Sequence, residues 1–206
     1  MVELLRTGLV GCGKVGHTHA AALRDLPDSE FVAVCDRNPD RAQAFAAQYD
    51  VRAYTNTPEM VEREKLQAVI VCTPHPVHAP PVLEALQAGA HVLVEKPMAT
   101  TLSDCDAMLA AARQAKVKLN VISQRRLYVP ARRVKAAIEA GKIGTPILAT
   151  VTMLGWRDEA YYRSIPGVTR GRAKAAVSWS ARPSTSSIYC CGLWGRLPNC
   201  RGIGQT

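Results

Sequence analysis

The sequence predicts an α/β protein, in which a doubly wound parallel sheet is followed by an incomplete second α/β domain. Three observations predict this class. Short apolar runs alternate with segments of helical character, a glycine-rich turn at Gly11–Gly16 follows the first apolar run, and an acidic residue, Asp36, closes the second run. Continuous apolar strands separated by helices are typical of a parallel sheet that is covered on both faces.

The first predicted elements surround the glycine turn. Leu4–Val10 is a short apolar run that predicts a strand, and the alanine-rich segment His17–Leu26 predicts a helix. Glu30–Asp36, with the sequence EFVAVCD, predicts the second strand. The chain therefore begins with a strand, a turn, a helix and a strand.

The later elements repeat this alternation. We expect helices at Pro39–Tyr49, Ala79–Ala88 and Leu102–Lys116, and strands at Ala68–Cys72, His91–Glu95 and Lys118–Ile122. Pro39 fits the first turn of its helix, Gly89 fits the end of the next, and Thr101 or Ser103 is a suitable N-cap for the third. The pattern predicts a domain over residues 1–122.

Residues 123–164 predict the start of a second α/β domain. Pro130–Ala140 has the character of a helix, and Pro146–Leu154 alternates β-branched residues like a longer strand. Residues 165–206 hold no acidic residue and show no helical or strand period. We expect this last segment to be a poorly ordered tail.

Composition excludes several functional classes. The formal net charge of the chain is +9, but the first 164 residues hold 20 of the 26 basic and all 17 acidic residues, so their net charge is only +3. A surface that tracks phosphates along a nucleic acid has little support there. No apolar run approaches the length of a membrane span and no signal-peptide pattern begins the chain, so we expect a cytoplasmic protein with neither nucleic-acid nor membrane partners.

The glycine turn has the G-x-G-x-x-G spacing of a Rossmann dinucleotide-binding site. Gly11 permits the tight turn, Gly13 lets the backbone approach a pyrophosphate, and Gly16 lets helix and strand pack closely. The N-terminus of the helix supplies amides and a dipole for the phosphates. The predicted cofactor-binding residues in these two segments are Gly11, Cys12, Gly13, Lys14, Val15, Gly16, Asp36 and Arg37.

Asp36 and Arg37 bear on which dinucleotide binds. Asp36 lies twenty positions after Gly16 and is expected to accept hydrogen bonds from the adenosine ribose hydroxyls. A carboxylate at this place repels a 2′-phosphate, which favours NAD. Arg37 can pair with that phosphate, so NADP stays open as an alternative.

Three further motifs accompany the glycine turn. They are CTPHPVH at Cys72–His78, EKP at Glu95–Pro97 and GKIGTP at Gly141–Pro146. With these motifs the chain, from Leu4 to about Ser164, resembles the glucose-fructose oxidoreductase, inositol dehydrogenase and rhizopine catabolism (Gfo/Idh/MocA) family. The EKP tripeptide at the end of a strand is the most specific element of the resemblance.

The resemblance implies a Rossmann domain followed by an open-sheet α/β domain that carries the substrate and often the oligomer contacts. By the same resemblance, Lys96 is the catalytic residue near the nicotinamide, where an ammonium can stabilise an oxyanion and take part in proton transfer. Further cofactor-lining residues would be Thr73, Pro74, His78 and Glu95, and substrate contacts would be Gln124, Arg126, Trp156 and Arg157.

Each assignment has a simpler alternative. Lys96 can be a surface lysine before a proline turn. His17 with His19, or His75 with His78, can be imagined as metal ligands, but no complete set of Cys, His and carboxylate ligands accompanies them. We therefore predict no metal site. The cysteines show no C-x-x-C spacing, and those of the body are predicted to be buried, reduced thiols.

The tail suggests a shifted reading frame. The family expects a triple glycine, then a histidine eight positions on and an aspartate three later. When one nucleotide is added before codon 165, back-translation of Ile165–Gly171 can read DPWRDTW and that of Arg172–Trp179 can read ASEGGGVL. We hypothesise a one-nucleotide loss near Ile165; a genuine divergent tail is the alternative.

The expected function is that of an NAD(P)-dependent oxidoreductase. It transfers a hydride between nicotinamide and a small-molecule substrate, namely a sugar, a sugar derivative or a cyclic polyol, and this chain is expected to be impaired by its altered C-terminal part. Family members often form homo-oligomers, which we do not expect to assemble normally here. The alternatives are a non-catalytic dinucleotide-binding or sensor module and an inactive gene fragment.

Overall fold

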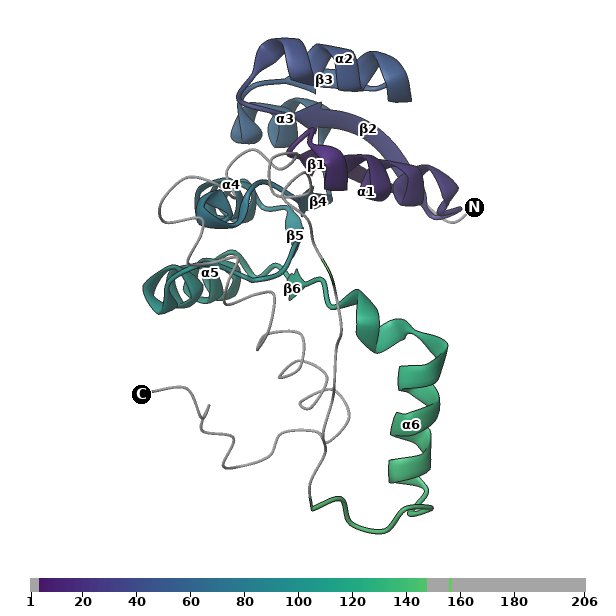
Figure 1. Ribbon diagram of the computed structural model, residues 1–206. Helices are drawn as coiled ribbons and strands as arrows, with labels where there is room; N and C mark the ends of the chain where they lie inside the picture. The colour runs from purple at the N-terminus through teal and green to yellow at the C-terminus, as the bar shows by residue number, and fades with distance from the viewer. Residues whose placement is uncertain (1–3, 148–155, 157–206) are drawn as a thin grey trace. The chain divides into compact units, whose positions relative to one another are not determined.

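A computed structural model describes residues 4–147 and residue 156 of the chain. The contacts between residues divide the chain into two compact units, Met1–Ile122 and Ser123–Thr206 (Figure 1). Each unit is described by itself below. The predicted tail over residues 165–206 lies outside the described residues.

The first unit is built on a parallel sheet of six strands, with the spatial order β3-β2-β1-β4-β5-β6. The strands are β1 (Leu5–Val10), β2 (Ser29–Cys35), β3 (Arg52–Tyr54), β4 (Ala68–Val71), β5 (His91–Val94) and β6 (Leu119–Val121). The strand order changes direction between β1 and β4. In sheets of this kind, the crevice beyond the carboxyl ends of the strands at that point is where ligands bind.

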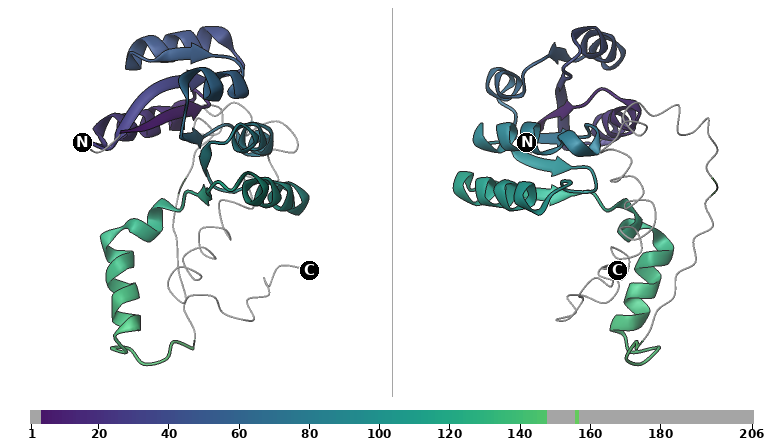
Figure 2. Two further views of the ribbon diagram at one scale, coloured as in Figure 1. Left: turned by 180° about the vertical axis from the view of Figure 1, so that it is seen from behind. Right: turned by 60° about the vertical axis from the view of Figure 1, so that its left-hand side comes forward.

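Five helices cover the two faces of the sheet. They are α1 (Lys14–Asp25), α2 (Pro39–Tyr49), α3 (Thr57–Glu64), α4 (Ala79–Gln87) and α5 (Leu102–Ala115). Ala20 of α1 and Phe45 of α2 pack in one buried cluster with Leu9 of β1. Met60 of α3, Val82 of α4 and Met108 of α5 belong to the other cluster. Figure 2 shows the helices on both sides of the sheet, which confirms the predicted doubly wound architecture.

The helices begin where their capping residues predict. The side chain of Asn38 accepts a hydrogen bond from the Arg41 amide at 3.1 Å and caps α2, which starts at Pro39. Thr101 caps α5 in the same way through the Asp104 amide, also at 3.1 Å, so Thr101 rather than Ser103 is the cap. Both caps satisfy an amide that has no partner within its helix.

One predicted helix starts earlier than expected, and two elements between Tyr49 and Ala68 are additional. Helix α1 starts at Lys14, three residues before the predicted His17, because Gly13 is its N-cap. The sequence interpretation placed nothing between Tyr49 and Ala68, where the structure has β3 and α3. Strand β3 is only three residues long and α3 carries four charged residues, so neither shows an apolar run or a wide apolar stripe.

The second unit begins with a short 3-10 helix, η2 (Gln124–Leu127), and continues with α6 (Val129–Glu139). Helix α6 confirms the helix predicted at Pro130–Ala140. Among the described residues of α6, none is buried. The predicted strand Pro146–Leu154 lies almost entirely outside the described residues.

Candidate dinucleotide-binding site

The glycine turn between β1 and α1 has a backbone that only glycine adopts without strain. Gly11 has a φ of +105°, and a Cβ atom built there would lie 2.8 Å from the backbone nitrogen of Thr73. The amide of Gly11 also donates to the carbonyl of Cys35 at 2.8 Å. The turn is therefore closely packed between the ends of β2 and β4.

Gly16 and Gly13 differ in what surrounds them. A Cβ at Gly16 would lie 2.5 Å from the Gly11 carbonyl oxygen, so this glycine lets α1 pack directly against the turn. A Cβ at Gly13 would meet nothing within 4 Å, and Gly13 is the exposed N-cap of α1. The first turn of α1 contains no acidic residue. This open space above a helix N-terminus fits a phosphate group, because the dipole and the unpaired amides favour an anion.

Asp36 connects the glycine turn to α2. Its carboxylate accepts hydrogen bonds from the Cys12 amide at 3.0 Å and from the Asn38 amide at 2.9 Å. Arg41 approaches the same carboxylate, with Nη1 3.5 Å from Oδ2. The structure thus brings Asp36 to the glycine turn, as predicted. Arg37 is exposed, and Arg41, which the sequence interpretation did not single out, is the arginine beside Asp36.

The segment after β4 lies next to the glycine turn. The Cys72 amide donates to the Val10 carbonyl at 2.9 Å. A short 3-10 helix, η1 (His75–Val77), follows, and the Thr73 hydroxyl before it donates to the carbonyl of its last residue, Val77, at 3.1 Å. His78 has no exposed surface. Its Nδ1 lies 2.8 Å from the Pro97 carbonyl oxygen and its Nε2 lies 2.8 Å from that of Thr73. The His78 ring therefore contacts the backbone of two loops, and the cofactor-lining role predicted for it stays a prediction.

Glu95 and Lys96 follow β5 at the same edge of the sheet. One oxygen of the Glu95 carboxylate lies 3.0 Å from Nε2 of His19 on α1, and the other accepts from the Lys96 amide at 3.0 Å. Burial alone would raise the pKa of Glu95, but the hydrogen bond and charge of His19 and the Lys96 amide outweigh it and lower the pKa. Glu95 therefore joins α1 to the backbone of the predicted catalytic lysine.

His75 is a third titratable group in this area. Its ring lies edge-on to that of His78, with 5.7 Å between the ring centroids. Burial, the positive charge of Lys96 and the nearby His78 lower the pKa of His75 to about 4. His75 is consequently neutral at physiological pH. The sequence interpretation considered it only as part of a metal pair.

The thiols around the glycine turn are poorly suited to nucleophilic chemistry. Cys12, Cys35 and Cys72 are buried and free, as predicted. Burial raises the pKa of Cys12 to about 12 and that of Cys35 to about 11, and it also raises the pKa of Cys72. Since the thiolate is the reactive form, these residues act as small packing groups. Within the described part of the chain, no three His, Cys, Asp or Glu side chains gather as a metal-ligating group.

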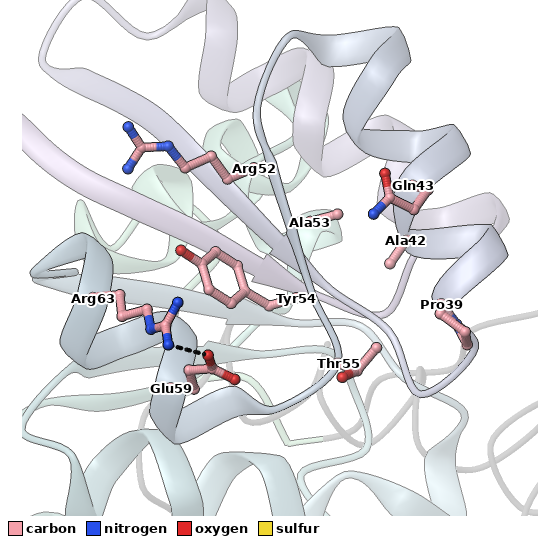
Figure 3. Close-up of a pocket in the computed structure, with 9 residues that line it drawn as sticks. All are labelled: Pro39, Ala42, Gln43, Arg52, Ala53, Tyr54, Thr55, Glu59 and Arg63. Atoms are coloured by element: carbon pink, nitrogen blue, oxygen red, sulfur yellow. Dashed lines mark ion pairs between the residues drawn. The ribbon is translucent and has the colours of Figure 1, made fainter.

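A separate depression lies between α2, β3 and α3 (Figure 3). Its volume is about 350 Å³, and its polar wall includes an ion pair between Arg63 and Glu59 with an N–O distance of 3.1 Å. Its lining residues are Pro39, Ala42, Gln43, Arg52, Ala53, Tyr54, Thr55, Glu59 and Arg63. None of the predicted site residues lines it.

The predicted substrate contacts belong to the second unit. Gln124 and Arg126 lie in η2, and Trp156 is 91% exposed. Arg157 lies outside the described residues. Their predicted contact with a substrate stays a prediction.

The sheet order, the glycine turn and the acid that closes β2 define a Rossmann domain of the dinucleotide-binding class. Residues 5–123, more than half of the chain, match the oxidoreductase family with the NAD-binding Rossmann fold. The chain therefore belongs to the Gfo/Idh/MocA oxidoreductase family, as the motifs predicted. Among the described residues, no helix is long and apolar enough to cross a membrane.

Several characterised proteins are similar to this chain. D-apiose dehydrogenase of Paraburkholderia graminis is 35% identical over 73% of the chain, and inositol 2-dehydrogenase 3 of Saccharopolyspora erythraea is 35% identical over 70%. A solved structure of the WlbA dehydrogenase from Bordetella pertussis, in complex with NADH and UDP-GlcNAcA, is 35% identical over 80% of the chain, with a TM-score of 0.75. The chain covers 40%, 44% and 48% of the lengths of these proteins, so it spans less than half of each.

Proposed function

We propose that this chain carries the cofactor half of an NAD-dependent dehydrogenase or reductase that acts on a sugar, a sugar derivative or a cyclic polyol. The observation that carries the proposal is the geometry around Gly13, where open space at the N-terminus of α1 adjoins a carboxylate, Asp36, bonded to the Cys12 amide. The substrate class is supported by the similar proteins, of which two are named for apiose and inositol and the third was solved in complex with UDP-GlcNAcA.

The residues of the first unit divide into three roles along the sheet edge. The Gly13 region and the N-terminus of α1 hold the pyrophosphate, and Asp36 accepts from the adenosine ribose. The residues that follow β4 and β5 would hold the nicotinamide half, because these strands lie on the other side of the β1–β4 boundary from β2. Bound NAD supplies a ring carbon that accepts or releases hydride. Lys96, which follows β5, stabilises negative charge on the substrate oxygen and moves its proton.

The carboxylate of Asp36 favours NAD over NADP. It is held in place by two backbone amides, so it cannot easily turn away from a 2′-phosphate. Arg41 and Arg37 are the cations that could offset this repulsion, and use of NADP therefore stays a prediction. A cytoplasmic location, and the expectation that this chain does not assemble normally into the homo-oligomers of its family, stay predictions as well.

A binding module without turnover is the second candidate. It is favoured by the division of the chain, in which the predicted cofactor residues lie in the first unit and the predicted substrate residues belong to the second. The predicted boundary at residue 122, the beginning of a substrate domain over 123–164 and the shifted frame after residue 164 all stay predictions. Sequencing the gene around codon 165 tests the shifted frame directly.

Titration with NADH and NADPH, followed by nicotinamide fluorescence, tests the proposal. We expect NADH to bind more tightly than NADPH, and Asp36→Asn to reduce this preference about tenfold, because the repulsion of the 2′-phosphate is removed while an acceptor for the ribose remains. Asp25→Asn, at the exposed far end of α1, is the matched control and should keep the preference. Absence of NADH binding by the unsubstituted chain would overturn the proposal.

Turnover separates the two candidate functions. An enzyme changes the absorbance of the nicotinamide ring when a sugar or polyol is added to the NAD-loaded chain, and Lys96→Met abolishes that change. A binding module shows no change with any such compound, although its NADH titration saturates normally. The two results assign the chain to one class or the other.

A further inference from the structure

Two histidines contact the turn Glu95–Lys96–Pro97 from two sides, one of them partly buried and the other fully buried. His19 belongs to α1, the helix that begins at the glycine turn, and His78 follows η1, which begins shortly after β4. His19 contacts the Glu95 side chain, and His78 contacts the Pro97 carbonyl. Both histidines therefore connect the lysine segment to a part of the chain that carries the dinucleotide.

The contact on the α1 side is short and shielded from water. Nε2 of His19 lies 3.0 Å from Oε1 of Glu95, and each side chain is only 15% exposed. A carboxylate only accepts, so His19 donates. The second carboxylate oxygen accepts from the Lys96 amide at 3.0 Å. Two consecutive hydrogen bonds, from His19 to Glu95 and from the Lys96 amide to Glu95, thus link α1 to the backbone of Lys96.

The contact on the β4 side is more deeply buried. The His78 ring bridges the carbonyl oxygens of Thr73 and Pro97, each at 2.8 Å, and has no exposed surface. Carbonyl oxygens only accept, so a neutral ring donates to one of them and an imidazolium donates to both. The ring thus lies between the loop after β4 and the residue that follows Lys96, in contact with the backbone of both.

We propose that His19 and His78 are positioning residues, which hold the Glu95–Lys96–Pro97 turn from two sides and so place the Lys96 amine at the nicotinamide end of the cofactor. This inference rests on the proposed function, because Lys96 acts there. It assigns to the two histidines a role distinct from metal binding and from direct contact with the cofactor. It also explains why the Glu95 side chain points to α1 rather than standing free in the site.

Two ligands distinguish a local effect on this turn from a general effect on the fold. ADP-ribose contains the adenosine and both phosphates but lacks the nicotinamide ring, so its affinity reports the glycine turn and Asp36. NADH also reports the Lys96 end. We expect His19→Leu to weaken NADH binding about tenfold and to change ADP-ribose binding less than about twofold, since one hydrogen bond to a charged group is lost at the nicotinamide end only.

The matched variants make this test specific. In His19→Gln the side-chain amide can still donate to Glu95, so most of the NADH affinity should return. Lys96→Met should show the same selective loss as His19→Leu. His91→Gln, at the exposed start of β5 and the opposite end of that strand, should resemble the unsubstituted chain with both ligands.

Each outcome decides a different question. If His19→Leu binds both ligands normally, or loses both to the same extent, the positioning role of His19 is overturned. If the unsubstituted chain binds neither ligand, the proposed function itself fails. If it binds both but Lys96→Met binds NADH as tightly as the unsubstituted chain, the placement of Lys96 at the nicotinamide end fails, and the inference fails with it.

His78 needs a measurement that does not depend on a substitution in the core. In the unsubstituted, isotopically labelled chain, a His78 ring N–H that donates to a buried carbonyl should give a proton resonance protected from exchange with water. Hydrogen exchange of the Lys96 amide should then accelerate in His78→Asn, provided that circular dichroism shows a folded protein. An unprotected His78 ring N–H would contradict its positioning role, whichever way the variant behaves.

Discussion

The three glycines of the turn make different demands at the level of single residues. Gly16 touches the Gly11 carbonyl so closely that a Cβ would lie 2.5 Å from it, whereas a Cβ on Gly13 would point into open space. Gly13 has a φ of −93°, which any residue adopts. Gly16 is therefore needed for close packing, whereas the absence of a side chain at Gly13 leaves space for a ligand.

We predict opposite effects for alanine at these two glycines. Gly16→Ala should lower the free energy of unfolding by about 1–3 kcal/mol, because a backbone contact has to shift. Gly13→Ala should leave the free energy of unfolding nearly unchanged and weaken NADH binding, because its methyl group occupies the space proposed for the pyrophosphate. Chemical denaturation and NADH titration measure both effects. Equal NADH affinities for Gly13→Ala and the unsubstituted chain would contradict the phosphate assignment.

The residues proposed to contact the cofactor could be predicted from the sequence more readily than the residues that hold them in position. Gly11 and Asp36 could be predicted because their spacing in a strand-turn-helix-strand pattern reflects local backbone requirements. The contact of His19 with Glu95, 76 positions away, depends on the tertiary placement of α1 near the residues that follow β5, and local sequence spacing does not show it. The sequence likewise does not show that Arg41, and not the adjacent Arg37, contacts the Asp36 carboxylate. Arg41 is placed there by the first turn of α2, which begins after the Asn38 cap.

His75 gives a prediction for pH. Its pKa in the folded chain is about 4, against an ordinary value of 6.5, so the unfolded chain binds this proton first as the pH falls. The free energy of unfolding should therefore decrease from pH 6.5 to about pH 4, and His75→Gln should remove this part of the decrease. NMR titration of the His75 ring gives the pKa directly. A midpoint near 6.5 would contradict the burial and the charge of Lys96 as its causes.

At the level of elements, α3 is held by a buried carboxylate far from the glycine turn. The Glu64 side chain is 2% exposed and lies 2.8 and 2.7 Å from Nη1 of Arg52, through its two oxygens. It also accepts from the Tyr54 hydroxyl, and Nη2 of Arg6 lies 3.6 Å away. These contacts tie α3 to β3 and β1. Their partners are scattered over the sequence, which is a further reason why β3 and α3 were not predicted.

We predict that Glu64→Gln lowers the free energy of unfolding by about 1–3 kcal/mol without changing NADH affinity, because a buried charge-assisted network loses its anion. Burial opposes the ionisation of Glu64, but the hydrogen bonds from Arg52 and Tyr54 outweigh it and lower the pKa. The stabilisation is therefore complete above the ordinary value of 4.5 and is lost as the pH falls through the lower, folded value.

Glu62→Gln is the matched control for this change, since Glu62 is an exposed residue of the same helix. Urea denaturation at pH 7 should distinguish the two variants, and denaturation at successively lower pH should bring Glu64→Gln and the unsubstituted chain together. Equal stability of the two variants at pH 7 would show that the network contributes nothing measurable.

At the level of the whole molecule, the first unit contains its own core. Both buried clusters, one under α1 and α2 and the other under α3, α4 and α5, consist entirely of residues before Ile122. Strand β6 ends the sheet, pairing Val92 with Leu119 and Val94 with Val121. By contrast, the described residues of α6 contribute no buried side chain. Among the residues that the structure describes, the buried clusters that support the candidate site therefore lie within the first unit.

We predict that a fragment of residues 1–122 folds cooperatively and binds NADH within about twofold of the full chain, because the hydrogen bonds described above for the glycine turn and the Lys96 segment all join residues inside it. Thermal unfolding and fluorescence titration measure the two properties. A fragment of residues 1–116 is the control: it lacks β6, leaves the β5 edge and Val92 uncovered, and should unfold at a lower temperature. If the 1–122 fragment folds but loses NADH, residues beyond Ile122 complete the cofactor site, and the assignment of that site to the first unit is wrong.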